Sequence, residues 1–328
     1  MGPVAGGLRR RMLDAGARLY GAGWEIRRRA YARGLRRPRA VPARVVSVGN
    51  LTVGGTGKTT LTLELARRAR ERGVNVAVVC RRYHPGPEGS GDEERLYRRS
   101  LGTEPVYAGR SKREGAARAA AEGRSLVLVD DGFSHWTLAR DLDLVLLDAR
   151  DLWGSGRLLP AGRLREPRRA LQRAGVVVVS RLGPEEDARP LMEEARRYAP
   201  AALIAAARHR VEGVRRLDGG PAPAAAGPAV VVTGTGNPRA VETSAREAGF
   251  GPTELVTYRD HHWFARAEAE RELGRARRRN AALVLSAKDA VRWPGEVADA
   301  RIVIVEIAWQ WVSEGEAVER AVFREEEG

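Results

Sequence analysis

The chain alternates between short apolar runs rich in valine, leucine and isoleucine and segments in which apolar residues recur every three or four positions. The short runs predict buried strands, and the recurring positions predict helices that pack beside them. Alternation of the two is typical of a parallel sheet flanked by helices, so we expect an α/β fold. The expected strands lie at residues 45–48, 74–80, 126–129, 144–147, 176–179, 230–232, 283–285 and 302–307.

A tract rich in proline, glycine and alanine at residues 219–228 interrupts this alternation. Such a tract is typical of a loop or linker, and further strands follow it. A chain of 328 residues is long enough for two hydrophobic cores. We therefore expect a larger domain at residues 41–205 and a smaller α/β domain at residues 206–328.

Residues 1–40 carry a pattern of their own. Apolar side chains recur there at helical spacing, and we call these seven residues the apolar stripe: Leu8, Met12, Ala15, Leu19, Ala22, Ile26 and Ala30. Tyr20, Trp24 and Tyr31 lie beside the stripe, and arginines surround it. The pattern predicts an amphipathic, basic helix, which either lies on an anionic membrane surface or packs on its own domain.

The charge is uneven, because residues 1–40 hold +9 of the formal net charge of +15. An arginine-rich segment favours an anionic partner, either nucleic acid or the phosphate surface of a membrane. Cys80 is the only cysteine, which excludes an internal disulfide or a zinc site of paired cysteines and fits a reducing compartment. No uninterrupted apolar stretch of about 18 residues and no apolar leader occur, so we expect a cytoplasmic protein without a membrane span.

The strongest local signal is a glycine-rich loop between an expected strand and an expected helix. We call it the phosphate loop, and it consists of Thr52, Val53, Gly54, Gly55, Thr56, Gly57, Lys58 and Thr59. Its backbone N–H groups and the helix N-terminus suit phosphate oxygens, Lys58 suits the terminal phosphates, and Thr59 suits Mg²⁺. Although Thr52 stands where the usual pattern begins with glycine, the loop predicts a nucleoside triphosphate site.

A carboxylate follows a neighbouring strand. The apolar run at residues 126–129 ends at Asp130 and Asp131. Enzymes with a phosphate loop place an aspartate in this position to hold Mg²⁺ across the β- and γ-phosphates. We expect Asp130 to do so, with Asp131 either a second ligand of the metal or its water, or a turn residue.

Further polar motifs follow in order, and each has an ordinary structural explanation when taken alone. Together with the phosphate loop they resemble the tetraacyldisaccharide 4′-kinase family over nearly the whole chain after residue 40. The most specific blocks are Ser-Val-Gly-Asn-Leu-Thr at residues 47–52, Asp-Asp-Gly-Phe at 130–133, and Leu-Leu-Pro-Ala-Gly with Leu-Arg-Glu-Pro between 158 and 167. The others are Gly-Asp-Glu at 91–93, Thr-Gly-Thr-Gly-Asn-Pro at 233–238, Asp-His-His at 260–262 and Lys-Asp at 288–289.

This resemblance implies a P-loop NTPase-like kinase domain joined to a smaller α/β domain across an active-site cleft. It implies transfer of the γ-phosphate of ATP to the 4′-hydroxyl of a tetraacyldisaccharide 1-phosphate, a lipid A precursor, by a peripheral enzyme at the cytoplasmic face of the inner membrane. Asp92 matches the family's catalytic base and His261 its partner across the cleft, which closure of the domains would bring together. Asp130 and Asp131 match the metal-site acids, and the N-terminal helix matches the membrane-docking element.

The chain departs from the family at a few positions. Arg82 and His84 stand where the family has two glycines after the second strand, a steric cost if either backbone adopts positive φ. Ser134 replaces a glutamine and Thr60 a proline. These changes affect the expected identity of the acceptor more than the expected binding of ATP. We expect Arg81 and Arg165 to contact the anionic sugar phosphate of the acceptor.

Two other classes fit parts of the sequence. A GTPase-type switch, or another kinase, would use the same loop, but a switch needs an Asn-Lys-x-Asp or Thr-Lys-x-Asp motif, and residues 286–289 lack the residue between lysine and aspartate. A nucleic-acid-binding module would use the basic N-terminal segment, but zinc-finger spacing and aromatic base-stacking motifs are absent from the sequence. We therefore expect no specific nucleic-acid partner.

Overall fold

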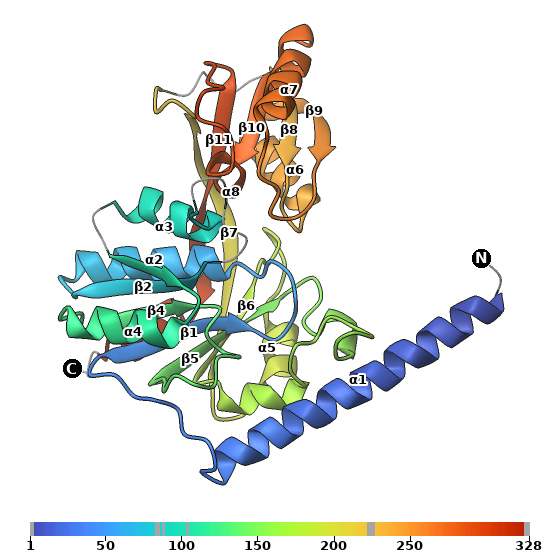
Figure 1. Ribbon diagram of the computed structural model, residues 1–328. Coiled ribbons are helices and arrows are strands. Elements are labelled where there is room, and N and C mark those ends of the chain that lie inside the picture. The colour runs from blue at the N-terminus through green and yellow to red at the C-terminus, as the bar shows by residue number, and fades with distance from the viewer. Residues whose placement is uncertain (1–2, 83–85, 87–88, 103–104, 222–226, 325–328) are drawn as a thin grey trace. The chain divides into compact units, whose positions relative to one another are not determined.

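The computed structural model confirms the expected α/β fold, in which mostly parallel strands are flanked by helices (Figure 1). A strand is present at every position where the apolar runs predict one. Strands also occur at Val106–Gly109, Leu203–Arg216 and Phe250–Thr257, where the sequence pattern is less regular. The structure describes residues 3–82, 86, 89–102, 105–221 and 227–324.

The chain divides into two compact units, each made of separate segments. The first unit contains Met1–Cys80, Glu104–Arg208 and Gln310–Gly328, and the second contains Arg81–Thr103 and His209–Trp309. This differs from the two contiguous domains expected at residues 41–205 and 206–328, because residues 81–103 belong to the second unit and residues 310–328 to the first. The physical reason is that the two long strands β7 (Leu203–Arg216) and β11 (Ile302–Ser313) each run from one unit into the other.

The first unit is built on strands in the order β3-β2-β4-β1-β5-β6-β7. Their bounds are β1 Arg44–Asn50, β2 Val76–Arg81, β3 Val106–Gly109, β4 Leu126–Asp130, β5 Leu142–Asp148 and β6 Val176–Ser180. The helices of this unit are α1 Pro3–Ala32, α2 Lys58–Glu71, α4 Lys112–Ala121, α5 Arg189–Arg196 and α9 Gly315–Phe323, with short 3-10 helices at Gly154–Gly156 and Arg168–Arg173. Strands β4 and β6 are buried along their whole length, which explains why their sequences are continuous apolar runs.

The parallel register brings several polar residues to one edge of this sheet. β1 pairs in parallel with β4 and β5, so that Val48 lies opposite Asp130, and β5 pairs with β6, so that Asp148 lies opposite Ser180. The phosphate loop leaves β1 at the same edge. Because ligands of open α/β sheets bind at the carboxyl ends of the strands, this edge is where a site is expected.

The second unit continues the strand order as β7-β11-β10-β8-β9. Its further elements are α3 Asp92–Leu101, β8 Gly227–Thr233, α6 Pro238–Glu247, β9 Phe250–Thr257, α7 Arg266–Arg278, β10 Ala282–Ser286 and α8 Ala287–Ala290. β10 pairs in parallel with β8 and β11, and β8 pairs in parallel with β9. The loops that follow β8, β9 and β10 therefore share one edge, and they carry the motifs at residues 233–238, 260–262 and 288–289.

Helix α1 is the long helix that the N-terminal pattern predicts. Its inner side carries Trp24, which is buried against Trp136 with ring centroids 6.2 Å apart. Helix α1 therefore packs on its own domain through Trp24. Met12, Leu19 and Ile26 of the apolar stripe take no part in this packing and are 68%, 75% and 69% exposed. No helix in the described part of the chain is long and apolar enough to cross a membrane.

Candidate active site

The phosphate loop follows β1 and ends at the first turn of α2. Gly54 and Gly57 adopt φ of 117° and 90°, a region that side chains rarely occupy, and a Cβ at Gly54 would also lie 2.7 Å from Nη2 of Arg163. Val53, Gly54 and Gly55 are exposed. The loop is therefore shaped by glycine where it turns, and its exposed backbone is available to phosphate oxygens.

Lys58 is held at the beginning of α2 by two neighbours. Its Nζ donates a hydrogen bond to Oδ1 of Asn50 at 3.1 Å and lies 3.7 Å from Oδ1 of Asp131. Asn50 is the last residue of β1, and Asp131 follows β4. The lysine that would meet the terminal phosphates is thus oriented by the ends of two adjacent strands.

Asp131 lies among three cations. Arg165 donates to both carboxylate oxygens, at 2.7 and 3.0 Å, and Nζ of Lys112 donates to the Asp131 carbonyl at 2.6 Å. Burial raises the pKa of the Asp131 carboxyl, but Lys58, Arg165 and Lys112 together outweigh burial and hold this pKa well below its usual range. Asp131 therefore carries a stable negative charge that orders these cations.

Asp130 is the carboxylate that meets the phosphate loop. It is buried, and its Oδ2 lies 3.5 Å from the hydroxyl of Thr59. A hydroxyl and a carboxylate are suitable ligands for Mg²⁺, which keeps most of its remaining positions for water and phosphate oxygens. No cluster of three His, Cys, Asp or Glu side chains able to hold a metal occurs among the described residues. The geometry favours Asp130 over Asp131 as the metal ligand.

Polar groups from two other segments brace the phosphate loop through its carbonyl oxygens. Arg163 donates to the Val53 carbonyl at 3.0 Å, and the Ser180 hydroxyl donates to the Thr56 carbonyl at 2.8 Å. Arg181, which follows Ser180, donates to Asp148 at 2.7 Å and also contacts the Gly55 carbonyl. The N–H of Val53 in turn donates to the Arg163 carbonyl at 2.8 Å, so Val53 is held through both its N–H and its carbonyl group.

The Asp-Asp-Gly-Phe block packs directly against β1. A Cβ at Gly132 would lie 2.6 Å from Cβ of Ser47, and a Cβ at Gly49 would lie 2.4 Å from Cβ of Phe133. Phe133 is buried in the core of the first unit. The glycines of these two motifs therefore permit a close approach that fixes Asp130 and Asp131 beside the phosphate loop.

The second unit brings together the two predicted catalytic residues. Asp92 is the first residue of α3 and is buried, and Nδ1 of His261 lies 2.7 Å from its Oδ2. The expectation that His261 approaches Asp92 only when two domains close is wrong, because both residues belong to the second unit and are already in contact. His261 adopts φ of 60° and donates its backbone N–H to the Gly234 carbonyl at 3.0 Å.

A buried arginine supports this pair. Arg292 donates to the Gly234 carbonyl at 2.9 Å and to Asp289 at 2.8 Å, and its Nη1 lies 3.9 Å from Oδ2 of Asp92. Asp289 in turn accepts the backbone N–H of Gly234 at 2.9 Å. The motifs at 233–238, 260–262 and 288–289 therefore form one hydrogen-bonded network around Asp92.

The network sets the protonation of the pair. Burial raises the pKa of Asp92, but the hydrogen bond and charge of His261 and the charges of Arg292 and Lys288 outweigh burial and lower it. The hydrogen bond to Asp92 raises the pKa of His261 above 6.5, although burial opposes this. Asp92 is therefore ionised near neutral pH, and the pairing favours the protonated form of His261 relative to that of a free imidazole.

The remaining predicted positions are placed less directly. Arg165 is bound to Asp131 inside the protein, and Arg81, the last residue of β2, is exposed, so their contact with a sugar phosphate stays a prediction. Arg82 does not adopt positive φ and pairs with the buried Glu94 at 3.2 Å, so the expected steric cost is absent there. His84 lies outside the described residues.

Several residues of the site were not found by sequence reasoning, among them Asn50, Lys112 and Arg292. Asn50 ends an expected strand directly before the phosphate loop, which was a usable signal. Lys112 and Arg292 lie on helical or turn segments without a motif, and nothing in their neighbourhood indicates that they are buried. Their roles depend on contacts made by the folded chain.

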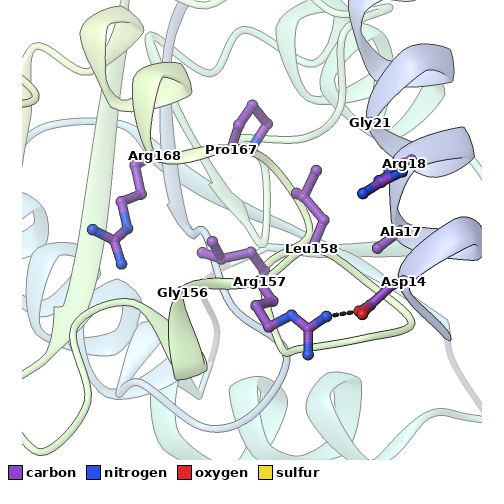
Figure 2. Close-up of a pocket in the computed structure, with 10 residues that line it drawn as sticks. Asp14, Ala17, Arg18, Gly21, Gly156, Arg157, Leu158, Pro167 and Arg168 are labelled. Atoms are coloured by element: carbon purple, nitrogen blue, oxygen red, sulfur yellow. Dashed lines mark ion pairs between the residues drawn. The ribbon is translucent and has the colours of Figure 1, made fainter. Parts of the chain in front are cut away.

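A groove of about 490 Å³ lies between α1 and the segment at residues 156–168 (Figure 2). Its apolar lining includes Ala17 and Leu158, and its charged lining comprises Asp14, Arg18, Arg157 and Arg168. Figure 2 shows Arg157 paired with Asp14 across the groove. Cations therefore outnumber anions among its lining residues.

A phosphate loop with its lysine, a strand-end aspartate and a separate Asp–His pair together define a P-loop kinase. The comparisons with known proteins identify the kind of kinase. A family model described as tetraacyldisaccharide-1-P 4′-kinase matches residues 9–325, and the chain belongs to this family.

Individual relatives agree with this assignment. The tetraacyldisaccharide 4′-kinase of Syntrophobacter fumaroxidans is 38% identical over 299 residues, which cover 84% of this chain and 77% of that protein. The protein of the same name from Halorhodospira halophila is 37% identical over 300 residues, which cover 87% of this chain and 84% of that protein. The crystal structure of LpxK from Aquifex aeolicus in complex with ATP shares the fold, with a TM-score of 0.74 and 23% identity, over 96% of this chain and 98% of that one.

Proposed function

We propose that this protein transfers the γ-phosphate of ATP to the 4′-hydroxyl of a tetraacyldisaccharide 1-phosphate, a step of lipid A biosynthesis. The observation that carries the proposal is the contact of 2.7 Å between Asp92 and His261 in a chain that also has a phosphate loop. A molecular switch has no acceptor hydroxyl and needs no such pair. The switch is therefore not favoured, and neither is a kinase of an unrelated acceptor.

The first unit supplies the triphosphate site. Lys58 and the N–H groups of the phosphate loop bind the phosphates, and Thr59 and Asp130 are the residues that would hold Mg²⁺. When bound, this ion neutralises charge on the β- and γ-phosphate oxygens. Asp131 keeps Lys58 and Arg165 in place through its permanent negative charge.

Asp92 supplies the chemistry at the acceptor. Its carboxylate accepts the proton of the 4′-hydroxyl as the bond from that oxygen to the γ-phosphorus forms and the bond between this phosphorus and ADP breaks. His261 orients the carboxylate, and the buried Arg292 keeps it ionised.

The lipid acceptor requires access to a membrane. The exposed apolar stripe and the arginines of α1 support peripheral attachment to the anionic cytoplasmic face of the inner membrane. The groove beside α1 offers Arg18 and Arg157 to a phosphate and an apolar wall to an acyl chain. It is a candidate acceptor site in addition to Arg81 and Arg165.

The test is the formation of ADP from ATP with two acceptors, a tetraacyldisaccharide 1-phosphate and its 4′-deoxy analogue, in mixed micelles. We expect ADP formation only with the first acceptor, and we expect GTP to be a poor donor. Equal ADP formation with both acceptors, from protein that binds ATP, would show that the 4′-hydroxyl is not the site of transfer.

A further inference from the structure

The inner side of α1 is bonded to two consecutive residues of the Leu-Arg-Glu-Pro motif. The hydroxyl of Tyr20 donates to the Arg165 carbonyl at 2.8 Å. One helical turn later, Nε1 of Trp24 donates to Oε2 of Glu166 at 2.9 Å. Both donors come from a helix whose opposite side carries the exposed apolar stripe.

Glu166 is a charged residue that the fold has buried almost completely, with 2% of its surface exposed. Its Oε2 accepts from Trp24 and, at 2.8 Å, from Arg173, whose guanidinium lies 4.2 Å from the ring centroids of Phe133 and Trp136. A buried carboxylate is tolerated only with its hydrogen-bond partners in place. The position of residue 166 therefore depends on the position of α1.

The neighbouring residue, Arg165, points to the triphosphate site. Its backbone N–H donates to the Leu51 carbonyl at 2.7 Å, and its guanidinium binds Asp131 and, at 3.1 Å, the Asn50 carbonyl. Asp131 is the anion that lies beside Lys58. A continuous series of short contacts thus runs from Tyr20 and Trp24 through residues 165 and 166 to Lys58.

We infer that Tyr20 and Trp24 are positioning residues for phosphoryl transfer, which act by holding the Arg165–Asp131 pair beside Lys58. This inference rests on the proposed function. It gives α1 a role beyond membrane attachment. The side of α1 that carries the apolar stripe contacts the membrane surface, while its inner side sets the geometry of the triphosphate site. If the two bonds only stabilise the fold, their removal lowers the melting temperature without changing turnover.

The first experiment measures turnover of Tyr20→Phe, Trp24→Phe and the double variant with a short-chain, water-soluble acceptor, so that membrane binding plays no part. Each change removes one hydrogen-bond donor and keeps an aromatic ring. We expect kcat of the double variant to fall about tenfold while KM for ATP and for the acceptor changes less than about twofold. Tyr31→Phe is the matched control, because this tyrosine lies on the same helix but packs on Trp136, with ring centroids 5.3 Å apart, and its kcat should not change.

A double-mutant cycle with Arg165→Lys tests whether the effect of Trp24 on turnover passes through Arg165. Lysine keeps the charge but loses the forked geometry, so Trp24→Phe should cost much less kcat in this background than in the parent. Equal costs in both backgrounds, or an unchanged kcat in the double variant Tyr20→Phe/Trp24→Phe, overturn the inference. Tyr20 is 41% exposed and the change removes only a hydroxyl, so Tyr20→Phe remains informative if the tryptophan variant folds poorly.

A second readout does not depend on the acceptor. The indole N–H signal of Trp24, identified in ¹⁵N NMR spectra by its loss in Trp24→Phe, should shift when ATP binds, and the shift should shrink in Arg165→Lys. A Trp24 signal that ATP leaves unchanged contradicts the coupling. Absence of acceptor-dependent turnover in the parent protein would count against the proposed function, whereas a parent that turns over and shows no Trp24 shift contradicts only the inference.

Discussion

Asp131 in the first unit and Asp92 in the second are both aspartates with a lowered pKa, but their partners differ. Asp131 is surrounded by the cationic side chains of Lys58, Arg165 and Lys112. Asp92 has one close titratable partner, the imidazole of His261. A carboxylate that is bound by several cationic side chains is suited to holding those side chains in place. A carboxylate beside an imidazole is suited to exchanging a proton.

The two units therefore have different tasks. The first unit binds and orders the triphosphate, and the second unit acts on the acceptor hydroxyl. Variants in the two units should differ in which kinetic constant they change.

Lys58→Ala should abolish phosphoryl transfer, because Lys58 is the residue of the phosphate loop that reaches the terminal phosphates. Its contacts with Asn50 and Asp131 are made at the edge of the sheet and not in the hydrophobic core, so the melting temperature should hardly change. Turnover measured with ATP and acceptor, beside a thermal unfolding curve, checks both points. A folded variant with near-normal turnover would remove the phosphate loop from the mechanism.

Asp92→Ala should lower kcat by roughly 10²–10⁴-fold, the usual contribution of a positioned general base, with little change in ATP affinity. Asp131→Asn should lower kcat and, in addition, weaken ATP binding, because it removes the anion that holds Lys58 and Arg165 and does not merely shift it. Steady-state kinetics and ATP titration of the two variants give the contrast. A mild effect of Asp92→Ala would move the role of base to Asp131 or Glu93 and would leave the kinase assignment intact.

His261→Ala should act through Asp92. Because the two side chains form one hydrogen-bonded pair, adding His261→Ala to Asp92→Ala should cost much less kcat than His261→Ala costs in the parent. The double-mutant cycle measures this directly. Losses that multiply would show that the two residues work independently.

The sequence predicted the phosphate loop and the Asp130 strand end from residue types alone, because strand, glycine loop and helix are local patterns. Asp92 and His261 were identified through the family resemblance, since no local rule joins residues that lie 169 positions apart. The hydrogen bond between Trp24 and Glu166 could not be predicted for the same reason, because the two residues are separated by 142 positions in the sequence. The orientation of the apolar stripe was also beyond the sequence, because a helical pattern does not tell which side packs on the fold.

The Asp92–His261 pair should also shape the pH dependence of stability, with an effect smaller than those on turnover. Asp92 has a lowered pKa, so its contribution is present above its unfolded value of about 3.9 and is lost as pH falls through the folded value. The pKa of His261 is raised, so its contribution is complete below about 6.5 and is lost as pH rises through the folded value. The difference in unfolding free energy between the parent and His261→Gln should therefore be largest in mildly acidic solution. A difference that does not change with pH would contradict the pairing.

The exposed stripe predicts the smallest effect on the chemistry itself. Replacement of Met12, Leu19 and Ile26 by serine should release the protein from anionic vesicles while kcat with a water-soluble acceptor stays unchanged. Val312→Ser, at a position on β11 that is also partly exposed, is the control and should leave vesicle binding unchanged. Cosedimentation with vesicles at low and high salt measures both, and undiminished binding of the triple variant would contradict the membrane role of α1.

The central claim is tested most directly by the chemical structure of the product. The purified protein is incubated with ATP and tetraacyldisaccharide 1-phosphate, and the lipid is recovered and examined by ³¹P NMR and mass spectrometry. The account predicts one added phosphate, attached as a monoester at the 4′ position, and no added phosphate with Lys58→Ala. A recovered lipid that carries only its 1-phosphate while ATP is consumed, or a phosphate added at another hydroxyl, would contradict it.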